Sequence, residues 1–130
     1  MDGYHELSMV TILALLECLV FSGLVGRARV KNKIEAPATT GNPEFERYFR
    51  VHQNTLEALV VFLPALWIFS MAVHYQIGVA LGLLFIVGRI IYATGYIKAP
   101  GKRTPGALMT FGVNYILVGG SLIWVAIKML

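Results

Sequence analysis

Four polar residues lie on one face of a predicted helix, where an apolar segment begins. Within RYFRVHQNTLEALVVFLPALWIF, residues 47–69, they are Arg50, Gln53, Asn54 and Glu57. At 100° per residue these side chains share about 100° of arc, and His52 falls on nearly the opposite side. Arginine suits a carboxylate, and glutamate can accept a hydrogen bond from an ammonium group. The stripe therefore predicts a site for a small ligand with both groups; the alternative is a set of snorkelling or mutually paired interfacial side chains.

A second stripe lies in a later apolar run. Arg89, Tyr92 and Tyr96 are spaced i, i+3 and i+7, within about 60° of arc on a helix. Arg89 is near the middle of its run, where a charged side chain should face the interior of a bundle or a wet cavity. The alternative for the tyrosines is an interfacial aromatic belt, which fits Tyr96 at the border better than Tyr92 one turn deeper.

Arg103 ends the charged part of the segment KAPGKRTPGAL, just before Pro105, which we expect to open the last helix. The simplest alternative is a loop arginine that only contributes to membrane orientation. Together with the two stripes, Arg103 predicts a cationic, hydrogen-bonding pocket with aromatic walls at one membrane border.

The remaining reactive side chains give weaker signals. Glu17 stands alone in the first apolar run, so it must be neutral, paired or exposed to water, and Arg89 is the candidate partner. Cys18 is expected to pack within a helix. The three histidines lack metal-ligand spacing, and neither a phosphate loop nor a G-x-S-x-G motif is present. We therefore expect no metal.

The composition specifies the elements that must position these side chains. The 130 residues are 57% hydrophobic and 14% charged, with a mean hydropathy of +0.69, which is typical of a membrane protein. We predict an all-α integral membrane protein, a single domain over residues 1–130. Four runs are long enough to cross about 30 Å of hydrocarbon. They are residues 8–26, 55–73, 77–96 and 105–127.

The basic residues are distributed asymmetrically. They gather between the first and second spans and between the third and fourth, whereas the short turn HYQ between the second and third has none. Both basic segments lie on the same side of a four-span protein, which the positive-inside rule makes cytoplasmic, with both termini outside.

The second helix is expected to begin before the membrane. Asn42 is a good N-cap, Pro43 suits the first helical position, and Glu44 and Glu46 complement the helix dipole. A helix from residue 43 to 73 would be about 46 Å long and would project into the cytoplasm. Pro64 would then lie inside the span, where a kink is tolerated.

Three segments resemble a known family. NPEFERYFRVHQNTLE, RIIYATGY and KRTPGAL are similar to segments of the membrane-associated proteins in eicosanoid and glutathione metabolism (MAPEG), most of all to the type 3 microsomal glutathione transferase branch. The resemblance covers roughly residues 25–110. It implies a homotrimer of four-helix subunits in a bacterial inner membrane or an endoplasmic reticulum type of membrane. Glutathione would bind between neighbouring subunits, near the cytoplasmic side.

The resemblance also implies roles for individual residues. Arg103 would be catalytic and would activate the glutathione thiol. The residues that would bind glutathione are Arg29, Arg50, Gln53, Asn54, Glu57, Arg89, Tyr92 and Tyr96. Two departures argue against leukotriene synthesis itself. Ala58 stands where some members have a tyrosine that contacts glutathione, and Val30 stands where leukotriene synthase has a second arginine.

The predicted function is conjugation of glutathione, as co-substrate, to lipophilic electrophiles that arrive through the membrane, or reduction of lipid hydroperoxides. Two alternatives remain: a non-enzymatic lipid-binding scaffold of the same family, and a small multidrug antiporter. An antiporter would explain Glu17 in the first span, but it needs neither polar stripe.

Overall fold

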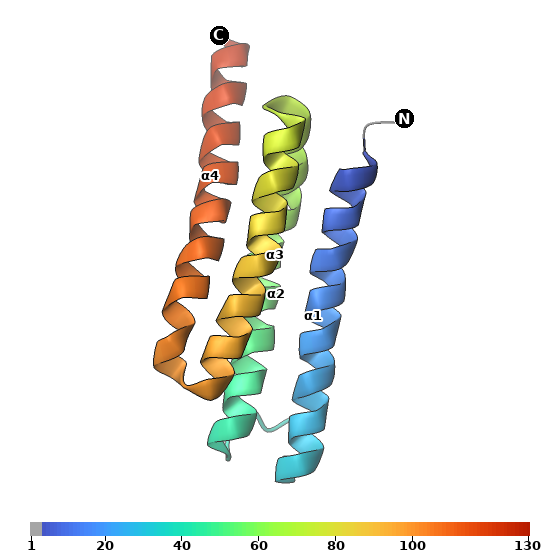
Figure 1. Cartoon of the computed structure of the whole chain (residues 1–130), viewed down its shortest axis with the longest axis vertical. Coiled ribbons are helices and arrows are strands. Elements are labelled where there is room, and N and C mark those ends of the chain that lie inside the picture. Colours follow the sequence, from blue (N-terminus) through green and yellow to red (C-terminus); the bar gives the residue numbers. More distant parts are fainter. Residues whose placement is uncertain (1–3) are drawn as a thin grey trace.

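The computed structural model describes residues 4–130 and shows an up-and-down bundle of four long helices (Figure 1). The elements are α1 (His5–Asn32), α2 (Pro43–Ala72), α3 (Tyr75–Lys98), the short 3₁₀ helix η1 (Pro100–Arg103) and α4 (Thr104–Met129). The α1–α2 connection and η1 lie at one end of the bundle, and the α2–α3 turn lies at the other end, where α1 begins and α4 ends (Figure 1). Both basic segments therefore lie at the same end, as predicted.

The helix limits follow the local sequence signals. The Oδ1 atom of Asn42 accepts a hydrogen bond from the Phe45 N–H at 3.0 Å, so the predicted N-cap of α2 is confirmed. Pro64 lies inside α2, and the helix continues through it. The α2–α3 turn is shorter than the expected HYQ, because His74 caps α3 by accepting from the Ile77 N–H and Tyr75 is already helical. The helix η1 was not predicted.

The four helices are held together by an apolar core. Phe62 of α2 and Phe85 of α3 are fully buried and stack with ring centroids 3.8 Å apart. Leu7 of α1 and Leu117 of α4 are also fully buried and belong to the same cluster. Every helix therefore contributes to one core, which fixes how the helices face one another.

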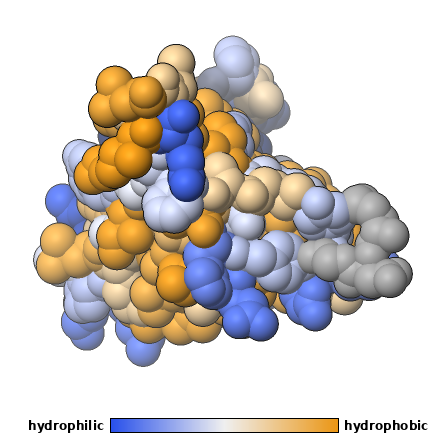
Figure 2. Space-filling model, turned by 90° about the horizontal axis from the view of Figure 1, so that it is seen from above, coloured by the Kyte–Doolittle hydropathy of each residue, from blue (hydrophilic) through white to orange (hydrophobic). Residues whose placement is uncertain are grey.

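The outer surface of the bundle is also apolar. Each helix contains an 18-residue window apolar enough to cross a membrane, and only 28–39% of each window is buried inside the chain. Seen from the end that carries the termini, much of the visible surface is formed by hydrophobic side chains (Figure 2). An apolar exterior over long helices is what lipid requires, and it confirms the predicted all-α, four-helix membrane architecture.

Helices α3 and α4 approach closely at two glycines. A Cβ atom at Gly106 would collide with the backbone of Tyr92, and one at Gly88 would lie 2.8 Å from the Thr110 side chain. Small residues allow such approaches between membrane helices. This crossing brings the second polar stripe, on α3, against the start of α4.

Candidate functional site

A groove of about 520 Å³ lies between α2 and α4 and contains five of the nine predicted site residues. We call it the α2–α4 groove. Its lining residues are Asn54, Glu57, Ala58 and Val61 of α2, Arg89 and Tyr92 of α3, Arg103 of η1, and Ala107, Phe111, Asn114, Tyr115 and Val118 of α4. Part of the first polar stripe, part of the second polar stripe and the loop arginine thus meet in one place.

The floor of the groove is formed by Arg89 and Tyr92, each only 3% exposed. The Nε and Nη2 atoms of Arg89 donate to Thr55 Oγ1 at 3.1 and 2.8 Å, and its Nη1 donates to Thr110 Oγ1 at 3.2 Å. The guanidinium carbon also lies 3.9 Å from the centroid of the Tyr92 ring. Hydroxyl oxygens and an aromatic face compensate part of the cost of burying this charge.

Asn54 connects α2 to this floor. Its Nδ2 atom donates to the Tyr92 hydroxyl oxygen at 2.6 Å. Since the hydroxyl acts as an acceptor in this bond, its own hydrogen is left to donate elsewhere. Tyr92 therefore offers an O–H donor at the groove, held in place by a neighbouring amide.

Arg103 lies at the rim and is exposed. Its Nη1 atom donates to the Pro100 carbonyl at 2.7 Å, and its guanidinium carbon lies 5.7 Å from the centroid of the Tyr96 ring. Among residues 4–130 this is its one hydrogen bond, so most of the five guanidinium N–H donors can reach a ligand. The 3₁₀ turn positions the arginine over the groove, which a loop without structure would not do.

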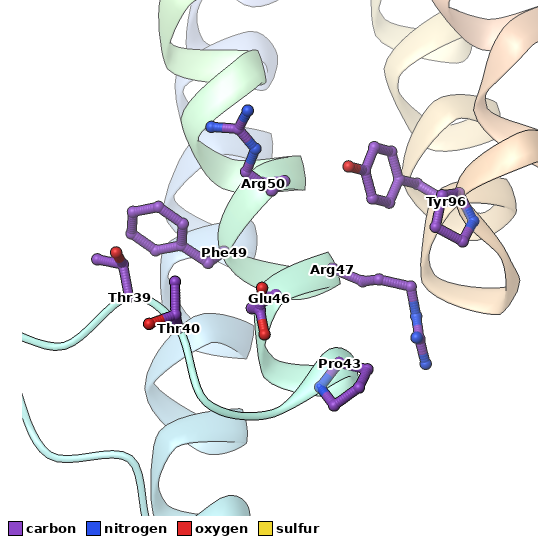
Figure 3. Close-up of a pocket in the computed structure, with 9 residues that line it drawn as sticks. Thr39, Thr40, Pro43, Glu46, Arg47, Phe49, Arg50 and Tyr96 are labelled. Atoms are coloured by element: carbon purple, nitrogen blue, oxygen red, sulfur yellow. The ribbon is translucent and has the colours of Figure 1, made fainter.

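A second cavity of about 510 Å³, which we call the rim cavity, lies at the basic end of the bundle (Figure 3). Its lining residues are Thr39, Thr40, Pro43, Glu46, Arg47, Phe49, Arg50, Tyr96 and Pro100. Arg47 is fixed there because its Nε donates to the Ile97 carbonyl at 2.8 Å. Tyr96 lines the rim cavity and Tyr92 lines the α2–α4 groove, and their ring centroids are 5.5 Å apart. The two cavities therefore lie on either side of one aromatic pair.

Two predicted residues lie outside both cavities. Arg29 donates to the carbonyls of Ala38 at 2.7 Å and Ile34 at 3.5 Å, and it lies over the Phe45 ring. Gln53 is half-buried on α2 and lines neither cavity. The first stripe is therefore divided: Arg50 lines the rim cavity, and Asn54 and Glu57 line the groove.

The expected contact between Glu17 and Arg89 is not made as an ion pair. Both Glu17 carboxylate oxygens are buried and have no hydrogen-bond partner among residues 4–130. The arginine donors are directed to Thr55 and Thr110 instead. Neither threonine was among the predicted residues. The signal that points to them is general: a buried arginine in a membrane helix needs acceptors, and hydroxyl groups on neighbouring helices supply them.

Asn114 was also missed. It lies on the α4 wall of the groove and donates from Nδ2 to the Ala58 carbonyl at 3.3 Å. Within residues 4–130, no three histidine, cysteine, aspartate or glutamate side chains lie close enough together to hold a metal ion. The polar groups that line the groove are guanidinium, phenol, amide and carboxylate groups.

Comparison with known proteins places these features in context. The family model described as "MAPEG family" matches residues 7–123. An uncharacterised protein of Synechocystis sp. is 45% identical over 116 residues, which cover 89% of this chain and 85% of the relative. Microsomal glutathione S-transferase 2 of Homo sapiens is 39% identical over 85% of this chain and 76% of its own length. Leukotriene C4 synthase of Cavia porcellus is 37% identical over 78% and 68%, respectively. The glutathione transferase among these relatives is named as type 2, so the similarity to the type 3 branch stays a prediction.

Proposed function

The chain belongs to the MAPEG family, and from this premise we propose that it is a membrane-bound glutathione transferase. The observation that carries the proposal is the groove itself: Arg103, Asn54, Glu57 and Tyr92 line one cavity between α2 and α4. Its polar end suits the carboxylates and the ammonium group of glutathione. Its apolar walls suit a lipophilic second substrate, and they are continuous with helices that face lipid.

Arg103 is proposed to activate the thiol. A thiol of pKa about 8.5 is only about 3% thiolate at pH 7, and lowering that pKa to about 6 gives roughly 90%. Such a shift requires about 3.4 kcal/mol of preferential thiolate stabilisation. The unused guanidinium donors of Arg103 and the free O–H of Tyr92 are two groups that can supply it.

The remaining polar residues are proposed to hold the tripeptide. Arg50 and Tyr96, which line the rim cavity, would bind a carboxylate, and Glu57 would accept from the ammonium group. Arg29 and Gln53 lie away from both cavities of their own chain. We propose that they act on a neighbouring subunit's site in a homotrimer, with the basic end of the bundle facing the cytoplasm.

In conjugation, the thiol gives up its proton, the thiolate sulfur forms a bond to the electrophilic carbon, and a leaving group departs with its electron pair. With a lipid hydroperoxide, the thiolate would attack the terminal peroxide oxygen, and the alcohol would leave. A second glutathione would then convert the resulting sulfenic acid to glutathione disulfide, with loss of water. Both reactions need the same thiolate, so one groove can serve both.

The test is an assay of the detergent-purified protein with glutathione and either a chlorodinitrobenzene-type electrophile or a fatty acid hydroperoxide. We expect turnover with the electrophile that saturates in glutathione. Glutathione binding without turnover would favour the lipid-binding scaffold. Neither binding nor turnover would refute the proposal.

A further inference from the structure

Arg47 joins α2 to the end of α3. Its Nε atom donates to the Ile97 carbonyl at 2.8 Å, between positions that are 50 residues apart in the sequence. Ile97 lies in the last turn of α3, where the carbonyl groups have no partner within the helix. A cation is also favourable at this end of a helix, because it complements the helix dipole. The bond therefore ties the last turn of α3 to α2.

Two simpler roles for Arg47 fit the structure less well. An arginine that only sets the membrane orientation would extend into solvent, whereas Arg47 is half-buried. A role in an ion pair would need a carboxylate, but Glu44 is bound to Lys31 and Asn32 instead. Within residues 4–130, the one hydrogen bond of Arg47 is to a backbone carbonyl.

The turn that follows α3 is short and lies directly on the helix end. The Ala99 N–H donates to the Gly95 carbonyl at 3.1 Å, and the Lys102 N–H donates to the Ala99 carbonyl at 2.9 Å. A Cβ atom at Gly95 would collide with the Lys102 carbonyl oxygen. Arg103 is bonded to the same turn, because its Nη1 donates to the Pro100 carbonyl at 2.7 Å. A shift of the end of α3 would therefore move Arg103 as well.

Arg103 must be placed relative to side chains that lie on α2. Asn54 and Glu57 line the groove from α2, and Asn54 is bonded to Tyr92 of α3. Beyond Tyr92, the Arg47 side chain makes the one hydrogen bond between α2 and residues 93–103 in the described part of the chain. The position of Arg103 relative to the α2 wall of the groove therefore depends on Arg47.

We infer that Arg47 is a positioning residue: by holding the end of α3 against α2, it places the Arg103 guanidinium beside the glutathione sulfur. The inference rests on the proposed function and adds a residue to the same site. Arg47 lines the rim cavity and not the groove, so it acts on the sulfur only through Arg103.

Two variants separate the hydrogen bond from the charge. Arg47→Leu removes both. Arg47→Gln places an amide nitrogen at the same position along the side chain as Nε, so it keeps a donor for the Ile97 carbonyl without the charge. If the bond is what matters, Arg47→Gln should stay within about threefold of the wild-type kcat, because a neutral hydrogen bond is retained.

The pH profile distinguishes positioning from a general loss of folded protein. In Arg47→Leu the pKa of the bound thiol should rise from about 6 to about 8, which lowers the thiolate fraction and kcat at pH 7 about tenfold. The KM for glutathione should change little. At about pH 9 kcat should return close to the wild-type value, since the thiol is then ionised in both proteins. An unchanged profile in Arg47→Leu, or the same defect in Arg47→Gln, would overturn the inference.

A double variant tests whether Arg47 acts through Arg103. In the Arg103→Ala background, Arg47→Leu should lower kcat by less than about twofold, because residues that act as a unit are not additive. A further tenfold loss in that background would overturn the inference, because Arg47 would then act independently.

Hydrogen exchange supplies a readout that does not need turnover. Arg47→Leu should accelerate exchange of the Ala99 and Lys102 amides about tenfold, while exchange in the middle of α2 stays the same. Unchanged exchange at these amides, in a wild-type protein that conjugates glutathione, would defeat the inference alone. If the wild-type protein turns over no electrophile, the proposed function fails, and the role of Arg47 in it fails as well.

Discussion

The floor and the rim of the α2–α4 groove use arginine in opposite ways. At the floor, Arg89 is buried, and all three of its donor nitrogens are bound to Thr55 and Thr110. At the rim, Arg103 is exposed, with one hydrogen bond to the Pro100 carbonyl. An arginine with three of its five N–H donors bound to the protein chiefly supports structure, whereas one with a single bound donor can stabilise a charge that develops on a ligand. We therefore expect different roles for the two arginines: Arg89 on α3 supports the fold, and Arg103 on η1 acts on the ligand.

The largest effect on stability and activity should come from a substitution that pushes the backbone of Tyr92, in the floor of the groove, away from α4. Gly106→Ala adds a methyl group where the Tyr92 backbone lies, so α3 and α4 must separate. We expect a loss of about 3 kcal/mol in unfolding free energy and loss of activity. Gly112→Ala is the matched control on the same helix, because a Cβ atom there would have no neighbour within 4 Å among residues 4–130. Thermal unfolding in detergent measures both, and equal stability of the two variants would contradict the close crossing.

The next largest effect should come from Arg103, at the rim of the α2–α4 groove. Arg103→Ala is expected to reduce kcat about 100-fold, the order found for removal of one donor to a developing anion, while it changes glutathione affinity little. Arg50→Ala should show the reverse pattern, with weaker glutathione binding and a smaller change in kcat. Steady-state kinetics and calorimetric binding separate the two. If the patterns are exchanged, the roles of the two arginines must be exchanged as well.

Arg89→Lys should affect stability more than chemistry. Lysine keeps the charge but cannot donate to Thr55 and Thr110 together from one planar group. We expect a loss of about 2 kcal/mol in unfolding free energy, since hydrogen bonds that involve a charged group are each of that order. The parallel variant Arg103→Lys should leave stability unchanged. A large loss of kcat in Arg89→Lys at normal stability would show that the floor arginine acts on the ligand directly.

The contrast between floor and rim also separates what the sequence could predict from what it could not. Helical periodicity placed Asn54 with Glu57 on one helix face and Arg89 with Tyr92 on another, and in the structure each pair lines the groove. Residues on one helix face keep their spacing whatever the neighbours are. It could not predict that Thr55 and Thr110 would hold Arg89. That pairing depends on the rotation of α2 and α4 about their axes, which packing of the core decides. The division of the first stripe between two cavities has the same origin.

The four-helix architecture was predictable for a different reason. Lipid forces each apolar run into a helix, so length and hydropathy are sufficient. The helix η1, which positions Arg103, has no such constraint. Its conformation depends on local turn chemistry around Pro100, together with the close approach of Gly95 to the Lys102 backbone. Arg103 could therefore be identified from the sequence, whereas the η1 conformation that positions it could not.

The smallest effect should come from Glu17, and it tests whether the floor needs a counter-ion. Arg89 is bound to neutral hydroxyl groups, and the Glu17 carboxyl oxygens are buried with no hydrogen-bond partner in the described part of the chain. Glu17→Gln keeps the shape but cannot ionise, so the unfolding free energy should change by less than about 0.5 kcal/mol, because a carboxyl group buried without a partner is more stable neutral than charged. Glu17→Ala is the matched control; it should be less stable because it leaves a gap beside the core. If Glu17→Gln instead loses 2 kcal/mol or more, Arg89 depends on a negative charge from α1. The floor would then be an ion pair across the bundle, and its contrast with the rim would disappear.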